Sequence, residues 1–188
     1  MTLKELTVKE GMDFVNQKLR ENQGSNRSQV IDKIQNVWHL VGQSYCTMGL
    51  AYTYYKAYML QHNIKFTADN IVETMRRNKD DWNKKGVYFS TSCQDMVNHN
   101  ALRGQFQAFN KVEDIDNVED GDYIIFQFSP KQRHIGQKVG REGKNMLLIE
   151  WNTSPHGNTS NDPNDGLDGV YLKKRVIDPK IILGYIHW

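Results

Sequence analysis

The stretch HLVGQSYCTMGLAYTYYKAYM, residues 39–59, decides how the rest of the chain must be arranged. After the break at Gly42, the segment from Cys46 to about Gln61 has the length of a helix and is apolar on nearly all sides. Such a helix is stable only when other elements cover it on several sides. We therefore expect a central helix that starts at Cys46, where unpaired backbone N–H groups favour a thiolate. The alternative is that Cys46 is a small buried apolar residue.

The segments on either side of this helix also show helical spacing of apolar residues. Residues 3–19 predict a first helix that is interrupted near Gly11. Residues 28–38 predict a second helix, opened by Ser28, with an apolar stripe that faces the core. A further helix is expected over about residues 67–78, capped by the threonine at its start.

The pattern changes after residue 85. Residues 86–106 mix a short apolar run with polar residues, and we assign no element to them. Past residue 120 the apolar spacing falls to two, in short β-rich runs separated by Gly, Pro, Asn or Asp. The runs are DYIIFQF (122–128), HIGQKV (134–139), NMLLIEW (145–151), GVYLKKRV (169–176) and IILGYIHW (181–188). Helices followed by a meander predict an α+β domain, with the helices packed on one side of an antiparallel sheet of about five or six strands.

Length and composition bound the function classes. A chain of 188 residues can form one domain with a core large enough to cover a cleft. Lys+Arg 24 against Asp+Glu 22 leaves a net charge of +2, and no basic cluster predicts a nucleic-acid interface. The first residues contain no apolar run of signal-peptide or membrane-span length, so we expect a soluble product synthesised in the cytoplasm. The two cysteines, Cys46 and Cys93, form no disulfide framework or zinc site, and we interpret both as reduced.

A candidate catalytic set follows from this arrangement. Of the six histidines, only His134 begins a predicted strand directly after a loop, in SPKQRHIGQKV. The next strand ends in IEWNTS, where the i, i+2 spacing places Glu150 and Asn152 on one face. Adjacent antiparallel strands would bring one of these two beside His134; we favour Glu150 and keep Asn152 as the alternative. Cysteine acyl-transfer enzymes use a thiol, an imidazole and an orienting carboxylate or amide.

Several motifs occur here in the order typical of one family. They are GQSYC before a helix, GDYIIFQF, RHIGQKVGREGKNMLLIEWNTS and the closing GVYLKKRVIDPKIILGYIHW. The chain resembles the CHAP domain, the cysteine, histidine-dependent amidohydrolase/peptidase group of the papain-like superfamily. The resemblance covers residues 24–188 and includes the segment NRSQVIDKI. It implies a papain-like fold. Residues 1–23 would then be an N-terminal helical extension, and residues 62–110, approximately, would be an insertion.

The resemblance assigns roles within this set. It implies that Cys46 is the nucleophile, His134 the base, Glu150 the orienting group and Asn152 a supporting polar residue. The family usually has Trp before the cysteine and a small pair after it, whereas this chain has Tyr45 before it and Thr-Met after it. This departure concerns the shape of the pocket more than its chemistry.

Other residues are candidates for supporting roles. Gln43 could join the Cys46 backbone N–H in holding an oxyanion, or it could be a capping or solvent-facing glutamine. Tyr45 and Trp151 are candidates for substrate binding, although most aromatic residues in a chain of this size belong to the core. Cys93 and His99 are interpreted as structural, because no helix start is evident at Cys93.

The proposed chemistry requires no cofactor and no metal. The loop NTSPHGNTSNDPNDGLDG is rich in oxygen ligands, and Asp162, Asp165 and Asp168 are candidates for calcium binding. The loop lacks the EF-hand spacing with its terminal Glu, so we do not expect a calcium site there.

The resemblance implies a peptidoglycan hydrolase that cleaves an amide bond, either as an N-acetylmuramoyl-L-alanine amidase or as a stem or cross-bridge endopeptidase. We expect a monomer that reaches the bacterial cell wall as a phage lysis or virion enzyme, or as a secreted antibacterial effector. Its partners would be a holin, a virion, a secretion machine or an immunity protein. We do not expect it to bind nucleic acid or a membrane. The alternatives are a catalytically silent wall-binding or phage structural module, and a cysteine protease or transamidase that acts on proteins.

Overall fold

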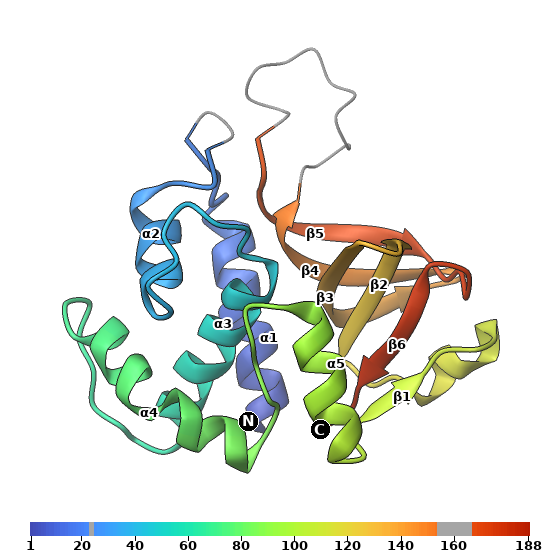
Figure 1. Cartoon of the computed structure of the whole chain (residues 1–188), viewed down its shortest axis with the longest axis horizontal. Helices are drawn as coiled ribbons and strands as arrows, with labels where there is room; N and C mark the ends of the chain where they lie inside the picture. The colour runs from blue at the N-terminus through green and yellow to red at the C-terminus, as the bar shows by residue number, and fades with distance from the viewer. Residues whose placement is uncertain (23–24, 154–166) are drawn as a thin grey trace.

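The computed structural model describes residues 1–22, 25–153 and 167–188 and shows an α+β fold (Figure 1). N-terminal helices pack on a C-terminal antiparallel sheet, as the sequence predicts. The elements are α1 (Leu3–Asn16), α2 (Gln29–Asn36), α3 (Cys46–Gln61), α4 (Ile71–Lys85), α5 (Cys93–Leu102), β1 (Phe106–Ala108), the 3-10 helix η1 (Val112–Asn117), β2 (Tyr123–Ser129), β3 (Gln132–Glu142), β4 (Asn145–Thr153), β5 (Gly169–Val176) and β6 (Ile182–Ile186).

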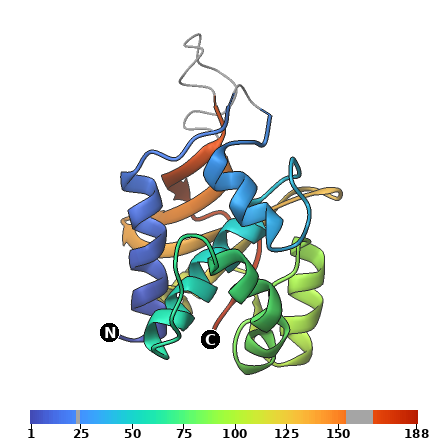
Figure 2. The same ribbon diagram turned by 90° about the vertical axis from the view of Figure 1, so that its left-hand side faces the viewer.

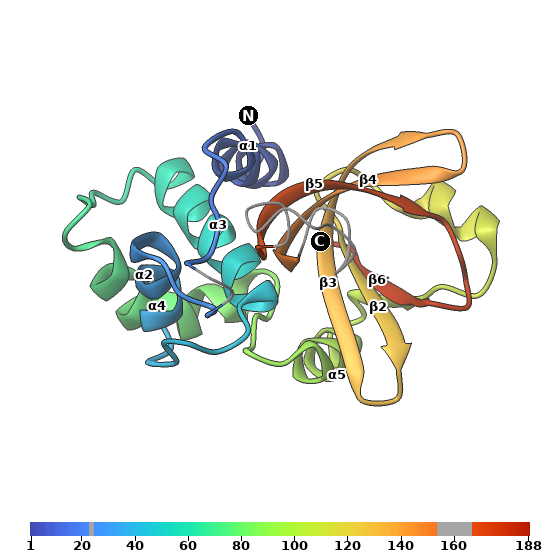
Figure 3. The same ribbon diagram turned by 90° about the horizontal axis from the view of Figure 1, so that it is seen from above.

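The sheet is more than a meander. Its strand order is β1-β6-β2-β3-β4-β5, and every pair of neighbouring strands is antiparallel. Strands β2 to β5 follow one another as expected, but β6 returns to lie between β2 and β1. The sequence did not indicate β1, which pairs with β6 from Phe106 opposite Ile186. Seen from above, helices α1 to α4 lie on one side and the curved sheet on the other, with α5 beside β3 (Figure 3).

Helix α3 is the central helix that its composition predicts. Buried residues occur all round it, and it packs against α1, α2, α4, β3 and β4. Gly49 permits the closest approach to the sheet, since a Cβ atom there would lie 2.2 Å from Cδ2 of Trp151. Figure 2 shows the helices in front of the sheet. One core cluster lies between these layers, and a second contains Ile124, Phe126, Met146 and Leu148.

Helix α1 differs from its prediction, because it is not interrupted at Gly11. The helix runs from Leu3 to Asn16 and begins with a capping box between Thr2 and Glu5. Gly11 is buried, and a Cβ atom there would lie 2.9 Å from Cδ1 of Ile149. This glycine therefore serves close packing of α1 on the sheet and does not mark a break.

The segment between α3 and the sheet also departs from the prediction. Helix α4 starts at Ile71 and not at Thr67, because Thr67 and Asn70 exchange hydrogen bonds in a turn that precedes the helix. The unassigned region contains α5, whose N-cap Ser92 accepts a hydrogen bond from the Asp95 N–H. Helix α5 then packs beside β3 (Figures 1 and 3). No helix in the described parts of the chain is long and apolar enough to cross a membrane.

Candidate functional site

Cys46 is the first residue of α3, as the sequence predicts. Its N-cap, Tyr45, provides no side-chain hydrogen bond to the first turn of the helix. The Thr47 N–H donates a hydrogen bond to the Cys46 sulfur. An uncapped helix N-terminus carries a partial positive charge, which favours the thiolate and leaves backbone donors available to a ligand.

His134 on β3 lies between Cys46 and Glu150. Its Nε2 is 3.0 Å from Oε2 of Glu150, and its side chain lines the same cleft as Cys46, which is close enough to raise the pKa of His134. In the ladder Glu150 is opposite Gly136, two residues from His134. A Cβ atom on Gly136 would lie 3.0 Å from the Glu150 Cγ. The glycine of the HIG motif therefore leaves the space through which the Glu150 side chain extends along the sheet toward His134.

Arg175 on β5 completes this set, and the sequence analysis missed it. Its Nε and Nη2 atoms each lie 2.6 Å from a different oxygen of Glu150. The guanidinium also lies 5.5 Å and 5.6 Å from the ring centroids of Phe126 and Phe128. Glu150 has a fully buried side chain, so this bidentate pair provides most of the compensation for its lost hydration. The alternation in GVYLKKRV places Arg175 on one face with Lys173, but nothing local to the sequence names Glu150 as its partner.

The pKa shifts describe a thiolate beside an imidazolium. Hydrogen bonds from Cys93, His134 and the Thr47 N–H lower the pKa of the Cys46 thiol, against the opposing effect of burial. Burial would lower the pKa of His134, but the contacts with Cys46 and Glu150 outweigh it and raise that pKa to about 9. Burial would likewise raise the pKa of Glu150, but Arg175 and then His134 lower it to about 2. Glu150 therefore stays ionised and holds the imidazolium in place.

Cys93 is the second residue that the sequence analysis did not assign to the site. It begins α5, and its thiol lies close to the Cys46 thiol, with which it lines one hollow. This contact and burial raise the pKa of Cys93 far above its ordinary value, so Cys93 is the protonated partner. The interpretation that no helix starts at Cys93 is wrong. The Ser-x-x-Asp pattern from Ser92 to Asp95 could have revealed the helix start.

Two hollows reach Cys46. A polar cleft of about 380 Å³ is lined by Cys46, His134, Asn152 and Arg175 among others, and we call it the Cys46 cleft. A second hollow of about 270 Å³ is lined by Cys46, Cys93 and Lys131 among others. Ser44 and Arg133 line both. The nucleophile candidate is therefore approachable from two sides.

Asn152 and Gln43 do not occupy the positions expected of them. Asn152 lines the cleft, but Glu150 and not Asn152 holds the His134 imidazole. The strand alternation breaks at Asn152, because a bulge lies between Trp151 and Thr153 and the φ angle of Asn152 is 56°. Within the described residues its Oδ1 atom is buried without a hydrogen-bond partner. Gln43 is exposed and does not line the cleft. Of its two readings, this position agrees with a solvent-facing glutamine and not with an amide directed at the Cys46 cleft.

Tyr45 and Trp151, the candidates for substrate binding, lie in the core and do not line the Cys46 cleft. Both have no exposed surface, and their rings pack edge to face with centroids 6.4 Å apart. Trp151 also packs on Phe14 and Gly49. Burial and the neighbouring carboxylate of Glu21 raise the pKa of the Tyr45 hydroxyl well above its usual value. Tyr45 therefore belongs to the core under the site.

The calcium candidates fall largely outside the described residues, which exclude Asp162 and Asp165. Asp168 lines the Cys46 cleft, and its backbone oxygen accepts a hydrogen bond from the Glu21 N–H. In the described ranges no group of three or more His, Cys, Asp or Glu side chains is placed to hold a metal ion.

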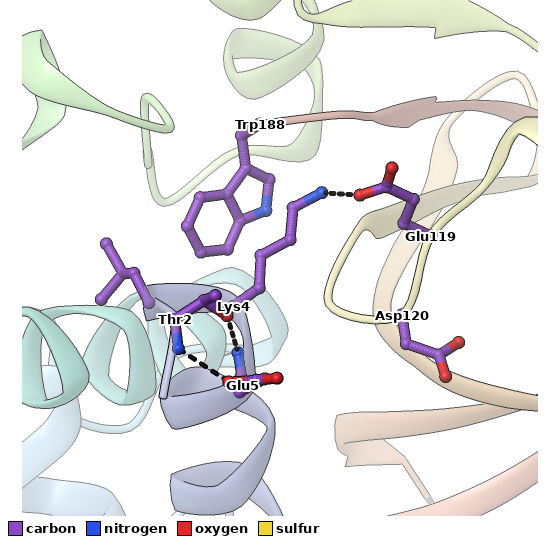
Figure 4. A pocket seen from close by; sticks show the side chains of 7 residues that line it. Thr2, Lys4, Glu5, Glu119, Asp120 and Trp188 are labelled. Carbon is purple, nitrogen blue, oxygen red and sulfur yellow. Dashed lines mark hydrogen bonds and ion pairs between the residues drawn. The ribbon is translucent and has the colours of Figure 1, made fainter.

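A separate hollow of about 710 Å³ lies where the start of α1 meets Trp188 (Figure 4). Lys4 crosses it to Glu119, with Nζ 2.8 Å from Oε2. It shares no lining residue with the Cys46 cleft, and neither cysteine lines it. The Cys46 cleft is therefore the hollow lined by the candidate nucleophile and the candidate base, with the Glu150 side chain buried behind His134.

Comparison with known proteins adds no identification: no protein-family model, no curated protein and no solved structure matches this chain. The functional argument therefore depends on the geometry of the site.

Proposed function

We propose that this protein is a cysteine hydrolase that cleaves an amide bond, with Cys46 as the nucleophile. One observation carries the proposal. The Cys46 sulfur lies at an uncapped helix N-terminus beside the His134 imidazole, whose Nε2 is held by a buried, ionised Glu150. These three side chains come from α3, β3 and β4. Burying the charge of Glu150 has a cost, and a buried charge oriented toward a cysteine–histidine pair in a cleft is typical of functional sites.

The chemistry follows from the order of these groups. The Cys46 thiolate attacks the amide carbonyl carbon, and the carbonyl oxygen becomes an oxyanion near the first N–H groups of α3. The His134 imidazolium then protonates the leaving nitrogen, so the C–N bond breaks and an acyl-enzyme remains. Neutral His134 takes a proton from water, which attacks the acyl carbon and releases the carboxylic acid and the thiolate. Glu150 keeps the same tautomer of His134 in position through both steps.

We propose peptidoglycan as the substrate class, because the motifs around Cys46, His134 and Glu150 resemble those of the CHAP family. The polar character of the cleft agrees with a peptide substrate that carries carboxylates, since Arg133 lines it and its guanidinium contacts only the neutral side chains of Gln94 and Gln127 among the hydrogen bonds described here. Such an enzyme would act at the bacterial cell wall after delivery by a holin, a virion or a secretion machine.

The test is a digestion of insoluble peptidoglycan by the reduced protein, with the soluble products analysed by mass spectrometry in water labelled with ¹⁸O. We expect new amino groups and one labelled carboxylate oxygen at the cleaved bond. Cys46→Ala should abolish release, whereas His62→Ala, at the opposite end of α3, should retain it. Full activity of Cys46→Ala would overturn the proposal.

The same experiment separates the alternatives. Sacculi that retain the protein but release nothing would indicate a binding module. Products without the ¹⁸O label and with a new amide would indicate acyl transfer to an amine. Cleavage of a denatured protein substrate with no effect on sacculi would indicate a protease directed at proteins, with the same Cys46 mechanism but another substrate.

A further inference from the structure

The two cysteines of the chain meet at the site although 46 residues separate them, counting from position 47 to position 92. Each is the first residue of a helix, Cys46 of α3 and Cys93 of α5. Both side chains line the hollow of about 270 Å³, and each shifts the pKa of the other thiol, as close neighbours do. Both are free thiols in this structure.

Hydrolysis does not use the second thiol. The attack by Cys46, the proton transfer by His134 and the orientation by Glu150 are complete without Cys93. A hydrogen-bond donor beside a thiolate could be provided by a serine, which is inert to oxidation. A thiolate in contact with a protonated thiol is, by contrast, the pair of reactants from which an intramolecular disulfide forms.

We propose that Cys46 and Cys93 are a redox modification site, at which a peroxide converts the two thiols into a reversible disulfide. The proposal rests on the proposed function only for its effect on activity, since the disulfide removes the nucleophile of the hydrolase. The disulfide also protects Cys46 from the irreversible sulfinic and sulfonic acids.

The reaction balances with the peroxide as the only oxidant. The Cys46 thiolate attacks one oxygen of hydrogen peroxide, the O–O bond breaks, and Cys46 becomes a sulfenic acid while hydroxide leaves and takes a proton. The Cys93 sulfur then attacks the sulfenic sulfur, forms the S–S bond and expels the sulfenic hydroxyl, which leaves as water with the Cys93 proton. In total, two thiols and one peroxide give one disulfide and two molecules of water. A dithiol restores the two free thiols by thiol–disulfide exchange and is itself oxidised to a disulfide.

The surroundings favour the two steps in this order. Cys46 is reached from both hollows, whereas Cys93 is 8% exposed and lines only the smaller one. The peroxide therefore meets the ionised sulfur first. Arg133 lines both hollows and is available to stabilise the hydroxide that leaves. The adjacent Cys93 then intercepts the sulfenic acid before a second peroxide can react with it.

The test uses the full chain, treated with a slight excess of hydrogen peroxide, quenched with iodoacetamide and mapped by mass spectrometry without reduction. We expect a peptide pair joined through Cys46 and Cys93, complete loss of hydrolysis, and recovery of both free thiols and hydrolysis after dithiothreitol. The matched variant Cys93→Ser keeps a donor beside Cys46 but lacks the second sulfur. In this variant we expect sulfinic acid at Cys46 and no recovery with dithiothreitol.

Two results would overturn the inference. One is wild-type protein in which Cys46 becomes sulfinic acid while Cys93 remains a free thiol. The other is equal recovery of the Cys46 thiol in wild type and Cys93→Ser. Because the cross-link is read by mass, it can be detected even if the protein proves to have no hydrolase activity. Failure of the disulfide and failure of the proposed function are therefore separate results.

Discussion

Arg175 offers the sharpest test of the energetics of this site. The variant Arg175→Met removes the guanidinium and keeps most of the length of the side chain. Glu150, with a fully buried side chain, would then have only His134 as a partner among the hydrogen bonds described here. Removing one partner of a buried ion pair leaves an uncompensated charge and costs about 3–5 kcal/mol of unfolding free energy.

The pKa of Glu150 gives a second route to this magnitude. Burial opposes ionisation, and Arg175 followed by His134 lowers the pKa from 4.5 to about 2. At 1.36 kcal/mol per unit, the folded state favours the carboxylate by about 3 kcal/mol relative to the unfolded chain. Because the folded pKa is depressed, this stabilisation is present above pH 4.5 and is lost as the pH falls through about 2. The cost of Arg175→Met should therefore be measured at neutral pH.

The assay is equilibrium unfolding in urea, followed by circular dichroism. The matched control is Arg141→Met, because Arg141 forms an ion pair with Asp116 in which both side chains are exposed. We expect the control to cost less than about 1 kcal/mol. The double variant Glu150→Gln with Arg175→Met should recover part of the loss, since it leaves no orphaned charge. Equal losses in Arg175→Met and Arg141→Met would refute this reasoning.

Two further predictions concern the site and the core beneath it. Hydrolysis measured as kcat/KM should fall as the pH rises through about 9, because His134 then loses the proton that it must give to the leaving nitrogen; a rate that continues to rise beyond that pH would exclude His134 as the acid. The variant Gly49→Ala should cost about 1–3 kcal/mol or more of unfolding free energy and therefore lower the melting temperature. The reason is that the new methyl group would lie 2.2 Å from the Trp151 ring and overlap it. An unchanged melting temperature would mean that α3 does not pack on the sheet as described.

Part of the site is predictable because it follows from local rules. Apolar residues on all sides of residues 46–61 require a central helix, and the break before Cys46 places this residue at its start. Alternation along the strands puts His134 and Glu150 on one face of neighbouring strands. A hairpin that joins two such strands then fixes their separation in space. For these two side chains, proximity is therefore already a consequence of the sequence pattern.

Other expectations failed for reasons that are also physical. Tyr45 and Trp151 border catalytic candidates in the sequence, but each points to the opposite side of the backbone and joins the core. Asn152 should lie on the face of Glu150, but the bulge at the end of β4 changes its direction. A side chain next to a candidate catalytic residue in the sequence therefore does not necessarily face the cleft. Strand alternation predicts which face a side chain lies on, until a bulge interrupts it.

The sequence by itself determined the class of the fold, the start of α3 and the choice between Glu150 and Asn152 as the partner of His134, because these depend on apolar spacing and on contacts between neighbouring strands. Only the tertiary structure decided that Cys93 contacts Cys46 and that Arg175 neutralises Glu150. Both contacts depend on how α5 docks beside β3 and on how far a long side chain on β5 reaches along the curved sheet. No local pattern encodes such distances, since they result from the packing of the whole chain.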